Sequence, residues 1–185
     1  IYPPDEAMSP VDPGPLALRL EGAARPGHFA GVATVVSRLF DLVKPDRAYF
    51  GEKDAQQLRV VEWMSARRTS APPVSIRRVP TVRDADGLAL SSRNAYLTAE
   101  ERAAALALPV ALAQAAAQIR AGDDVAQTLA QASADILAAG FARVEYFALA
   151  DAVTLDELQH FDGRPARLLV AAKMGKTRLI DNLAI

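Results

Sequence analysis

The sequence between residues 47 and 58 reads Arg47-Ala-Tyr-Phe-Gly-Glu-Lys-Asp-Ala-Gln-Gln-Leu58. Its first part, 47–51, is a short aromatic run that ends in glycine and predicts a buried strand. From Asp54 to Arg68 the apolar residues return at helical spacing, which predicts a helix. A strand that leads directly into a helix is the repeating unit of α/β sheets, so this stretch indicates the fold class of the region.

The segments on either side continue the alternation of helices and strands. Between Gly31 and Val43 apolar residues recur at three- and four-residue spacing, and Lys44-Pro45 ends the pattern. Residues 74–79 read as a second strand, and the proline-rich start of the chain leaves room for a short helical turn at 16–21. Helix, strand, helix and strand in this order predict a parallel sheet with crossover connections.

The second half of the chain has a different character. Thr98 to Glu101 has the spacing of a capping box and opens an alanine-rich region, which predicts two helices divided at Gly122-Asp-Asp124. Three further strands, expected to pair in antiparallel fashion, follow at residues 144–149, 167–172 and 178–183.

The length of 185 residues suits one large domain or two small ones. We place the boundary near residue 85, where a polar, glycine-containing loop follows the last strand of the parallel sheet. We therefore expect residues 1–85 to hold part of a parallel α/β sheet. Residues 86–185 are expected to form a smaller α+β domain with an antiparallel sheet.

Composition excludes several classes of protein. Lys and Arg number 21 against 22 Asp and Glu, so no basic excess indicates a nucleic-acid partner. Cysteine is absent, which excludes disulfide scaffolds, thiolate metal sites and cysteine nucleophiles. No apolar run approaches the ~18 residues of a membrane span. We expect a cytoplasmic protein with neither a membrane nor a nucleic acid as partner.

The first candidate for chemistry is Gly51-Glu-Lys-Asp54, at the junction of the predicted strand and helix. Ligands of open α/β sheets bind outside the carboxyl ends of the strands, and a helix N-terminus favours anions. Lys53 would supply a mobile positive charge, and Asp54 could accept hydrogen bonds from ribose hydroxyls. The alternative is an ordinary helix start, with Asp54 as N-cap and Lys53 in solvent.

The second candidate is the loop from Asp86 to Asn94. Its two hydroxyls, Ser91 and Ser92, stand beside Arg93 and could bind a phosphate chain. An ordinary turn is the alternative, since Gly, Ser and Asn are common in loops.

Two more side chains could belong to a site, but each has a structural alternative. Gln57 lies one helical turn beyond Lys53 and could face the same pocket, or it could face solvent. His28 could polarise a substrate, although a capping or packing role is the stronger interpretation. No spacing typical of metal ligands occurs in the sequence, so no metal-binding residue is expected.

Five stretches of the sequence, taken together, resemble the pantoate–β-alanine ligase (pantothenate synthetase) family. They are Leu20-Glu-Gly-Ala-Ala-Arg-Pro-Gly-His-Phe-Ala-Gly-Val32, Phe50-Gly-Glu-Lys-Asp-Ala-Gln-Gln-Leu58, Val79-Pro-Thr-Val-Arg-Asp-Ala-Asp-Gly-Leu-Ala-Leu-Ser-Ser-Arg-Asn94, Leu169-Val-Ala-Ala172 and Thr177-Arg-Leu-Ile-Asp-Asn182. The resemblance implies an incomplete Rossmann-like sheet of the nucleotidyltransferase type in residues 1–85, followed by the α+β domain.

The resemblance also implies an activity and a site. Pantoate would react with ATP to give pantoyl adenylate and pyrophosphate, and β-alanine would then displace AMP to give pantothenate. The catalytic residues implied are Lys53, Ser91, Ser92 and Arg93. The ATP-binding residues implied are Gly51, Glu52, Lys53, Asp54, Val82, Leu90, Ser91, Ser92 and Arg93. Gln57 matches a pantoate-binding glutamine, Mg²⁺ would accompany ATP, and the protein is expected to be a homodimer.

Two departures from the family pattern bear on these expectations. Ala55 stands where the family has an aromatic residue, which would alter packing more than chemistry. The family's His-x-Gly-His motif does not precede Tyr2-Pro3, so we expect this chain to lack the N-terminal portion of the family. The alternative to a ligase is then a non-catalytic remnant that serves as a binding or dimerisation module.

Overall fold

The computed structural model describes residues 1, 9–69 and 73–185. The chain divides into two compact units, Ile1–Pro80 and Thr81–Ile185. The proline-rich start of the chain falls partly on residues 2–8, which lie outside the described residues.

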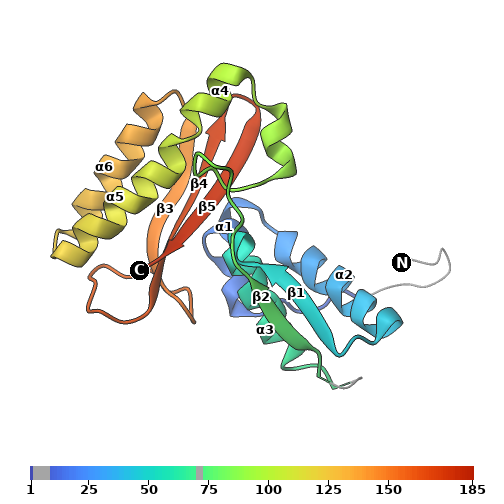
Figure 1. Cartoon of the computed structure of the whole chain (residues 1–185). Helices are drawn as coiled ribbons and strands as arrows, with labels where there is room; N and C mark the ends of the chain where they lie inside the picture. Colours follow the sequence, from blue (N-terminus) through green and yellow to red (C-terminus); the bar gives the residue numbers. More distant parts are fainter. Residues whose placement is uncertain (2–8, 70–72) are drawn as a thin grey trace. The chain divides into compact units, whose positions relative to one another are not determined.

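The first unit is built on two parallel strands, β1 (Arg47–Gly51) and β2 (Ser75–Val79). Gly51 pairs with Val79, so the carboxyl ends of the two strands lie at the same edge of the sheet. A short 3₁₀ turn, η2 (Glu52–Asp54), leads from β1 into α3 (Ala55–Ser65), and α3 connects the two strands. The predicted strand, helix and parallel strand are confirmed (Figure 1).

The helix α2 (His28–Val43) packs with α3 in one apolar cluster that also receives side chains from the sheet. The predicted start at Gly31 is three residues late, because Gly27 takes a left-handed conformation (φ 81°) and turns the chain directly into the helix at His28. The single turn predicted at 16–21 is instead two short helices. These are η1 (Pro15–Leu18) and α1 (Glu21–Ala24).

The second unit carries an antiparallel sheet in the order β3-β4-β5. Its strands are β3 (Arg143–Asp151), β4 (Ala166–Met174) and β5 (Thr177–Ala184). All three predicted strands and their antiparallel pairing are confirmed, and each strand extends slightly beyond its predicted bounds.

The alanine-rich region forms three helices where the sequence predicted two. They are α4 (Ala99–Ala104), α5 (Ala107–Ala121) and α6 (Val125–Ala138). The additional break has a physical cause in Pro109, which has no N–H to donate to the carbonyl of Ala105 and is tolerated only in the first turn of a helix. The capping box of Thr98 and Glu101 and the division at Gly122 are present as predicted.

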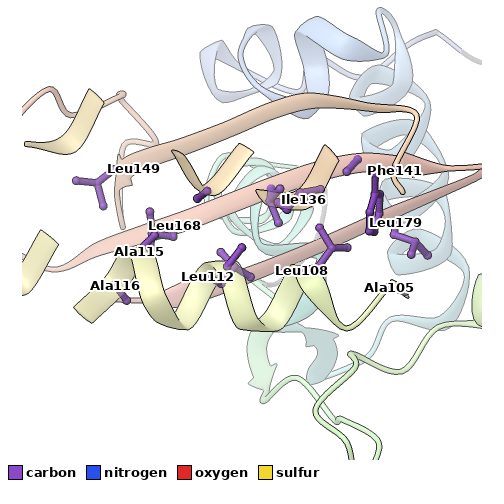
Figure 2. Packing of buried hydrophobic residues seen from close by; sticks show 14 of the residues in the cluster. Ala105, Leu108, Leu112, Ala115, Ala116, Ile136, Phe141, Leu149, Leu168 and Leu179 are labelled. Atoms are coloured by element: carbon purple, nitrogen blue, oxygen red, sulfur yellow. The ribbon is translucent and has the colours of Figure 1, made fainter. Parts of the chain in front are cut away.

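The helices α5 and α6 cover one face of the antiparallel sheet (Figure 1). Leu108, Leu112 and Ile136 are at most 1% exposed and belong to the same apolar cluster as Leu168 of β4 (Figure 2). The small alanine side chains between them let the helices approach closely. Residues Ala99–Ala121 are long and apolar enough to cross a membrane by composition, but the apolar side chains of α5 supply the core of this unit.

Candidate functional site

The segment Gly51-Glu-Lys-Asp54 lies at the carboxyl end of β1, as the sequence predicted. A Cβ atom at Gly51 would meet no described atom within 4 Å, so the space beside the backbone at the end of this strand is open. The tight η2 turn follows, with Lys53 half-buried and Asp54 exposed. Asp54 occupies the N-cap position of α3 but makes no capping hydrogen bond, so its carboxylate does not serve the structural role that was the alternative.

The two neighbouring glutamines of α3 have different surroundings. Gln56 is 4% exposed, and its amide holds the segment 16–21: Oε1 accepts from the Glu21 N–H at 3.0 Å, and Nε2 donates to the carbonyls of Leu16 and Arg19 at 2.7 and 2.8 Å. Gln57 is half-buried, and among the described residues its side chain makes no hydrogen bond. Gln56 is therefore structural, while Gln57 stays a candidate for binding a ligand.

Residues 82–90 of the second unit form a small hairpin-like loop. The Leu90 N–H donates to the Val82 carbonyl at 2.9 Å, Arg83 pairs with Ala89 as an antiparallel bridge, and Gly87 turns the chain with φ 96°. The hairpin brings together two residues that the family resemblance implies for ATP binding, since Val82 and Leu90 lie opposite each other. Both side chains are exposed, at 59% and 46%.

Buried and exposed ion pairs attach this hairpin to the rest of the second unit. The guanidinium of Arg83 donates two hydrogen bonds, of 2.7 and 2.8 Å, to the carboxylate of Asp181, which is 3% exposed on β5. The hydrogen bond with Asp181 raises the pKa of Arg83. Arg102 of α4 bonds Asp84 at 2.8 Å and Asp86 at 3.0 Å, and the bond from Arg102 lowers the pKa of Asp86.

The Ser91-Ser92-Arg93 segment follows the hairpin and opens the 3₁₀ helix η3 (Ser92–Tyr96). Ser91 is half-buried, and its hydroxyl accepts from the Arg93 N–H at 3.2 Å. Ser92 and Arg93 are exposed. The Arg93 guanidinium donates to the Arg178 carbonyl on β5 at 3.3 Å, which ties the segment to the sheet.

His28 is placed in a local polar cluster at the start of α2. Its Nε2 lies 3.1 Å from the Arg25 guanidinium, which also pairs with the buried Glu21 at 3.1 Å. The ring of His28 packs at 5.1 Å from that of Phe29. These contacts agree with the packing interpretation of this histidine.

The sequence interpretation missed Asp181, the buried partner of Arg83. The two residues are 98 positions apart, so no local pattern joins them. One feature of the sequence could have indicated it. Asp181 lies between Leu179 and Leu183 on one face of a predicted strand, and a carboxylate on an apolar face commonly has a buried partner. Among the residues that the structure describes, no three His, Cys, Asp or Glu side chains gather as a metal site.

A parallel strand–helix–strand unit with a lysine-bearing turn at the strand end, followed by an antiparallel α+β unit, defines a protein of the nucleotidyltransferase-like fold. The sequence model of the family described as pantoate-beta-alanine ligase matches residues 1–184. The chain belongs to this family.

The chain is similar to pantothenate synthetases from several bacteria. It is 56% identical over 185 residues to the enzyme of Rhizorhabdus wittichii, covering 100% of this chain and 64% of the relative. It is 58% identical over 164 residues to that of Sphingopyxis alaskensis, covering 89% of this chain and 58% of the relative. The chain therefore spans about three fifths of the length of these curated relatives.

Solved structures of the same family also match the chain. The crystal structure of pantothenate synthetase from Thermus thermophilus matches with a TM-score of 0.88 and 47% identity, over 98% of this chain and 65% of that one. The pantoate-beta-alanine ligase from Francisella tularensis, crystallised with beta-gamma ATP and beta-alanine, matches with a TM-score of 0.73 and 31% identity, over 97% of this chain and 59% of that one. The expected fold class and family are confirmed.

Proposed function

We propose that a full-length protein carrying this chain is an ATP-dependent ligase that joins pantoate to β-alanine. In the first step a carboxylate oxygen of pantoate attacks the α-phosphorus of ATP, the bond to the bridging oxygen breaks, and pyrophosphate leaves. In the second step the amine of β-alanine attacks the acyl carbon of pantoyl adenylate. AMP then leaves with the bonding electron pair, and the amine loses a proton.

The observation that carries this proposal is the place of Gly51-Glu-Lys-Asp54 at the carboxyl end of a parallel strand. Ligands of α/β sheets bind at this end of the strands, and the open space beside Gly51 lets a nucleotide approach the backbone. Adenylyl transfer moves negative charge onto the phosphate oxygens. A positioned ammonium group such as that of Lys53 stabilises this charge.

We assign roles to the other candidates in the same way. Ser91 and Ser92 donate hydroxyl hydrogen bonds to phosphate oxygens, and Arg93 contributes positive charge or anchors the segment through its bond to the Arg178 carbonyl. Gln57 binds pantoate, since its amide makes no hydrogen bond to the described residues. The residues proposed to bind ATP are Gly51, Glu52, Lys53, Asp54, Val82, Leu90, Ser91, Ser92 and Arg93.

Magnesium enters this proposal as part of the substrate, Mg·ATP. Mg²⁺ retains several waters and commonly binds through substrate phosphates, which agrees with its arrival on the nucleotide. We also propose a homodimer in the cytoplasm, acting on pantoate, β-alanine and ATP.

A single-turnover experiment on a full-length protein that carries this sequence tests the proposed function. With Mg·ATP and pantoate alone, we expect one pyrophosphate per active site and no free AMP. Addition of β-alanine should then release AMP and pantothenate together. Release of ADP, or pyrophosphate release that does not require pantoate, would contradict an adenylating ligase. Absence of any turnover would favour the alternative of a non-catalytic binding module.

A further inference from the structure

The hairpin at residues 82–90 carries two residues that we propose bind ATP. Few backbone hydrogen bonds and one apolar side chain hold this hairpin in place. Three backbone hydrogen bonds, each 2.9 Å long, close it: Leu90 N–H to Val82, Asp84 N–H to Leu88 and Gly87 N–H to Asp84. Leu88 is the one side chain of the hairpin that joins the apolar core of the second unit. The other attachments are polar, and the most buried of them runs through Arg83.

Arg83 joins the hairpin to β5 through a bidentate ion pair with Asp181. Nη1 bonds one carboxylate oxygen of Asp181 at 2.7 Å and Nη2 bonds the other at 2.8 Å. Nη1 also donates to the Gly87 carbonyl at 3.0 Å, across the hairpin. One guanidinium therefore fixes both the separation of the two hairpin arms and their place over the strand.

Asp181 is an unusual residue for its position. Along β5 side chains alternate between the two faces, so Asp181 shares a face with Leu179 and Leu183, and both leucines pack with the apolar core. A buried ion pair commonly adds no more stability than an apolar pair of similar volume. Asp181 also accepts from the Asn182 N–H at 2.7 Å, and the benefit of a carboxylate at this point lies in the fixed direction of the two hydrogen bonds that it accepts from Arg83.

We propose that Asp181 is a positioning residue for ATP: through Arg83 it holds the 82–90 hairpin in the conformation that binds the nucleotide. This inference rests on the proposed function, because it takes Val82 and Leu90 as contacts of ATP. The two carboxylates that Arg102 bonds, those of Asp84 and Asp86, are 39% and 44% exposed against 2% for Asp181, so solvent screens those ion pairs more and they contribute less to holding the hairpin.

The test compares Asp181→Asn with Asp162→Asn, a matched control that makes the same change in the exposed ion pair with Arg164. Amide hydrogen exchange in the 185-residue chain is read at Asp84 and Leu90, whose N–H groups close the hairpin. We expect Asp181→Asn to speed exchange at both amides by about tenfold or more. The control should leave both rates unchanged.

Steady-state kinetics of the same variants in a full-length protein measure KM for ATP and for pantoate separately. A purely structural role of Asp181 would not change KM for ATP selectively. Displacement of a binding loop is expected to raise KM for ATP by about 10- to 100-fold, while KM for pantoate stays at its wild-type value. A folded Asp181→Asn protein with wild-type exchange at both amides, or with unchanged KM for ATP, would overturn the proposal. If the wild-type protein does not use ATP, the proposed function fails, and the exchange rates alone decide whether Asp181 holds the hairpin.

A second variant keeps the proposal testable if Asp181→Asn does not fold. The double change Arg83→Gln with Asp181→Asn removes both charges, so no unpaired charge remains buried. It should show the same rapid exchange at Asp84 and Leu90. If neither variant folds, the pair serves stability and the proposal is wrong.

Discussion

Replacement of Gln56 by alanine is expected to destabilise the first unit without touching the proposed ligand sites. The Gln56 amide makes three hydrogen bonds to the backbone of the segment 16–21, at 2.7, 2.8 and 3.0 Å. Truncation leaves the Glu21 N–H and the carbonyls of Leu16 and Arg19 without this partner. The segment loses these three hydrogen bonds to α3.

The size of the effect follows from those three groups. A buried polar group that loses its partner costs about 1–3 kcal/mol, and water restores part of that cost where the bond is only partly buried. Only the Glu21 bond is fully buried. We therefore expect the free energy of unfolding to fall by about 2–4 kcal/mol.

Urea unfolding followed by the fluorescence of Trp63 measures this change. Trp63 is the single tryptophan of the chain and lies on α3, in the same unit as Gln56. The matched control is Gln57→Ala, which removes the same side chain one position later and should change the free energy by less than about 0.5 kcal/mol. Equal unfolding midpoints for the two variants would refute the division of roles between these glutamines.

Two other predictions concern the second unit. Ile136→Ala should lower the free energy of unfolding by about 2–5 kcal/mol, because Ile136 is 0% exposed in the core. Leu137 is 45% exposed on the same helix, so Leu137→Ala should lower it by less than about 1 kcal/mol. Urea unfolding followed by circular dichroism measures both changes. The hydrogen bonds from Arg164 lower the pKa of Asp162 from 3.8 to about 2, so its contribution to stability is present above about pH 4 and is lost as the pH falls through about 2. A carboxyl titration followed by NMR should give that midpoint, and Arg164→Ala should return it toward 3.8.

Features that depend on neighbouring residues were predictable from the sequence. The parallel strands, the capping box at Thr98 and the helix break at Gly122 each follow from a pattern within a few positions, and each is present. The break that Pro109 imposes is also a local feature, but high alanine content obscured it. Identification of a helix by composition overlooks that a proline cannot donate the backbone hydrogen bond that continues the helix; the Ala105 carbonyl instead accepts from the Leu108 N–H at 3.1 Å.

Features that depend on distant residues could not be predicted in this way. The bond between Arg83 and Asp181 spans 98 positions, and only the folded sheet brings the two together. Likewise, no local pattern predicted that Gln56 holds the segment 16–21, because its three hydrogen bonds reach residues 35 to 40 positions away.

Positional isotope exchange in ATP, driven by pantoate alone, tests the central claim most directly, since it reports reversible formation of the adenylate before β-alanine acts. In a full-length protein carrying this sequence, Lys53→Ala should slow the exchange by about 10²-fold or more, the scale expected when a positioned electrostatic contact is lost. Lys176→Ala is the matched control, because Lys176 is exposed in the turn between β4 and β5, and its exchange rate should equal that of the wild type. An unchanged rate in Lys53→Ala would contradict the assignment of Gly51-Glu-Lys-Asp54 as the catalytic ATP site.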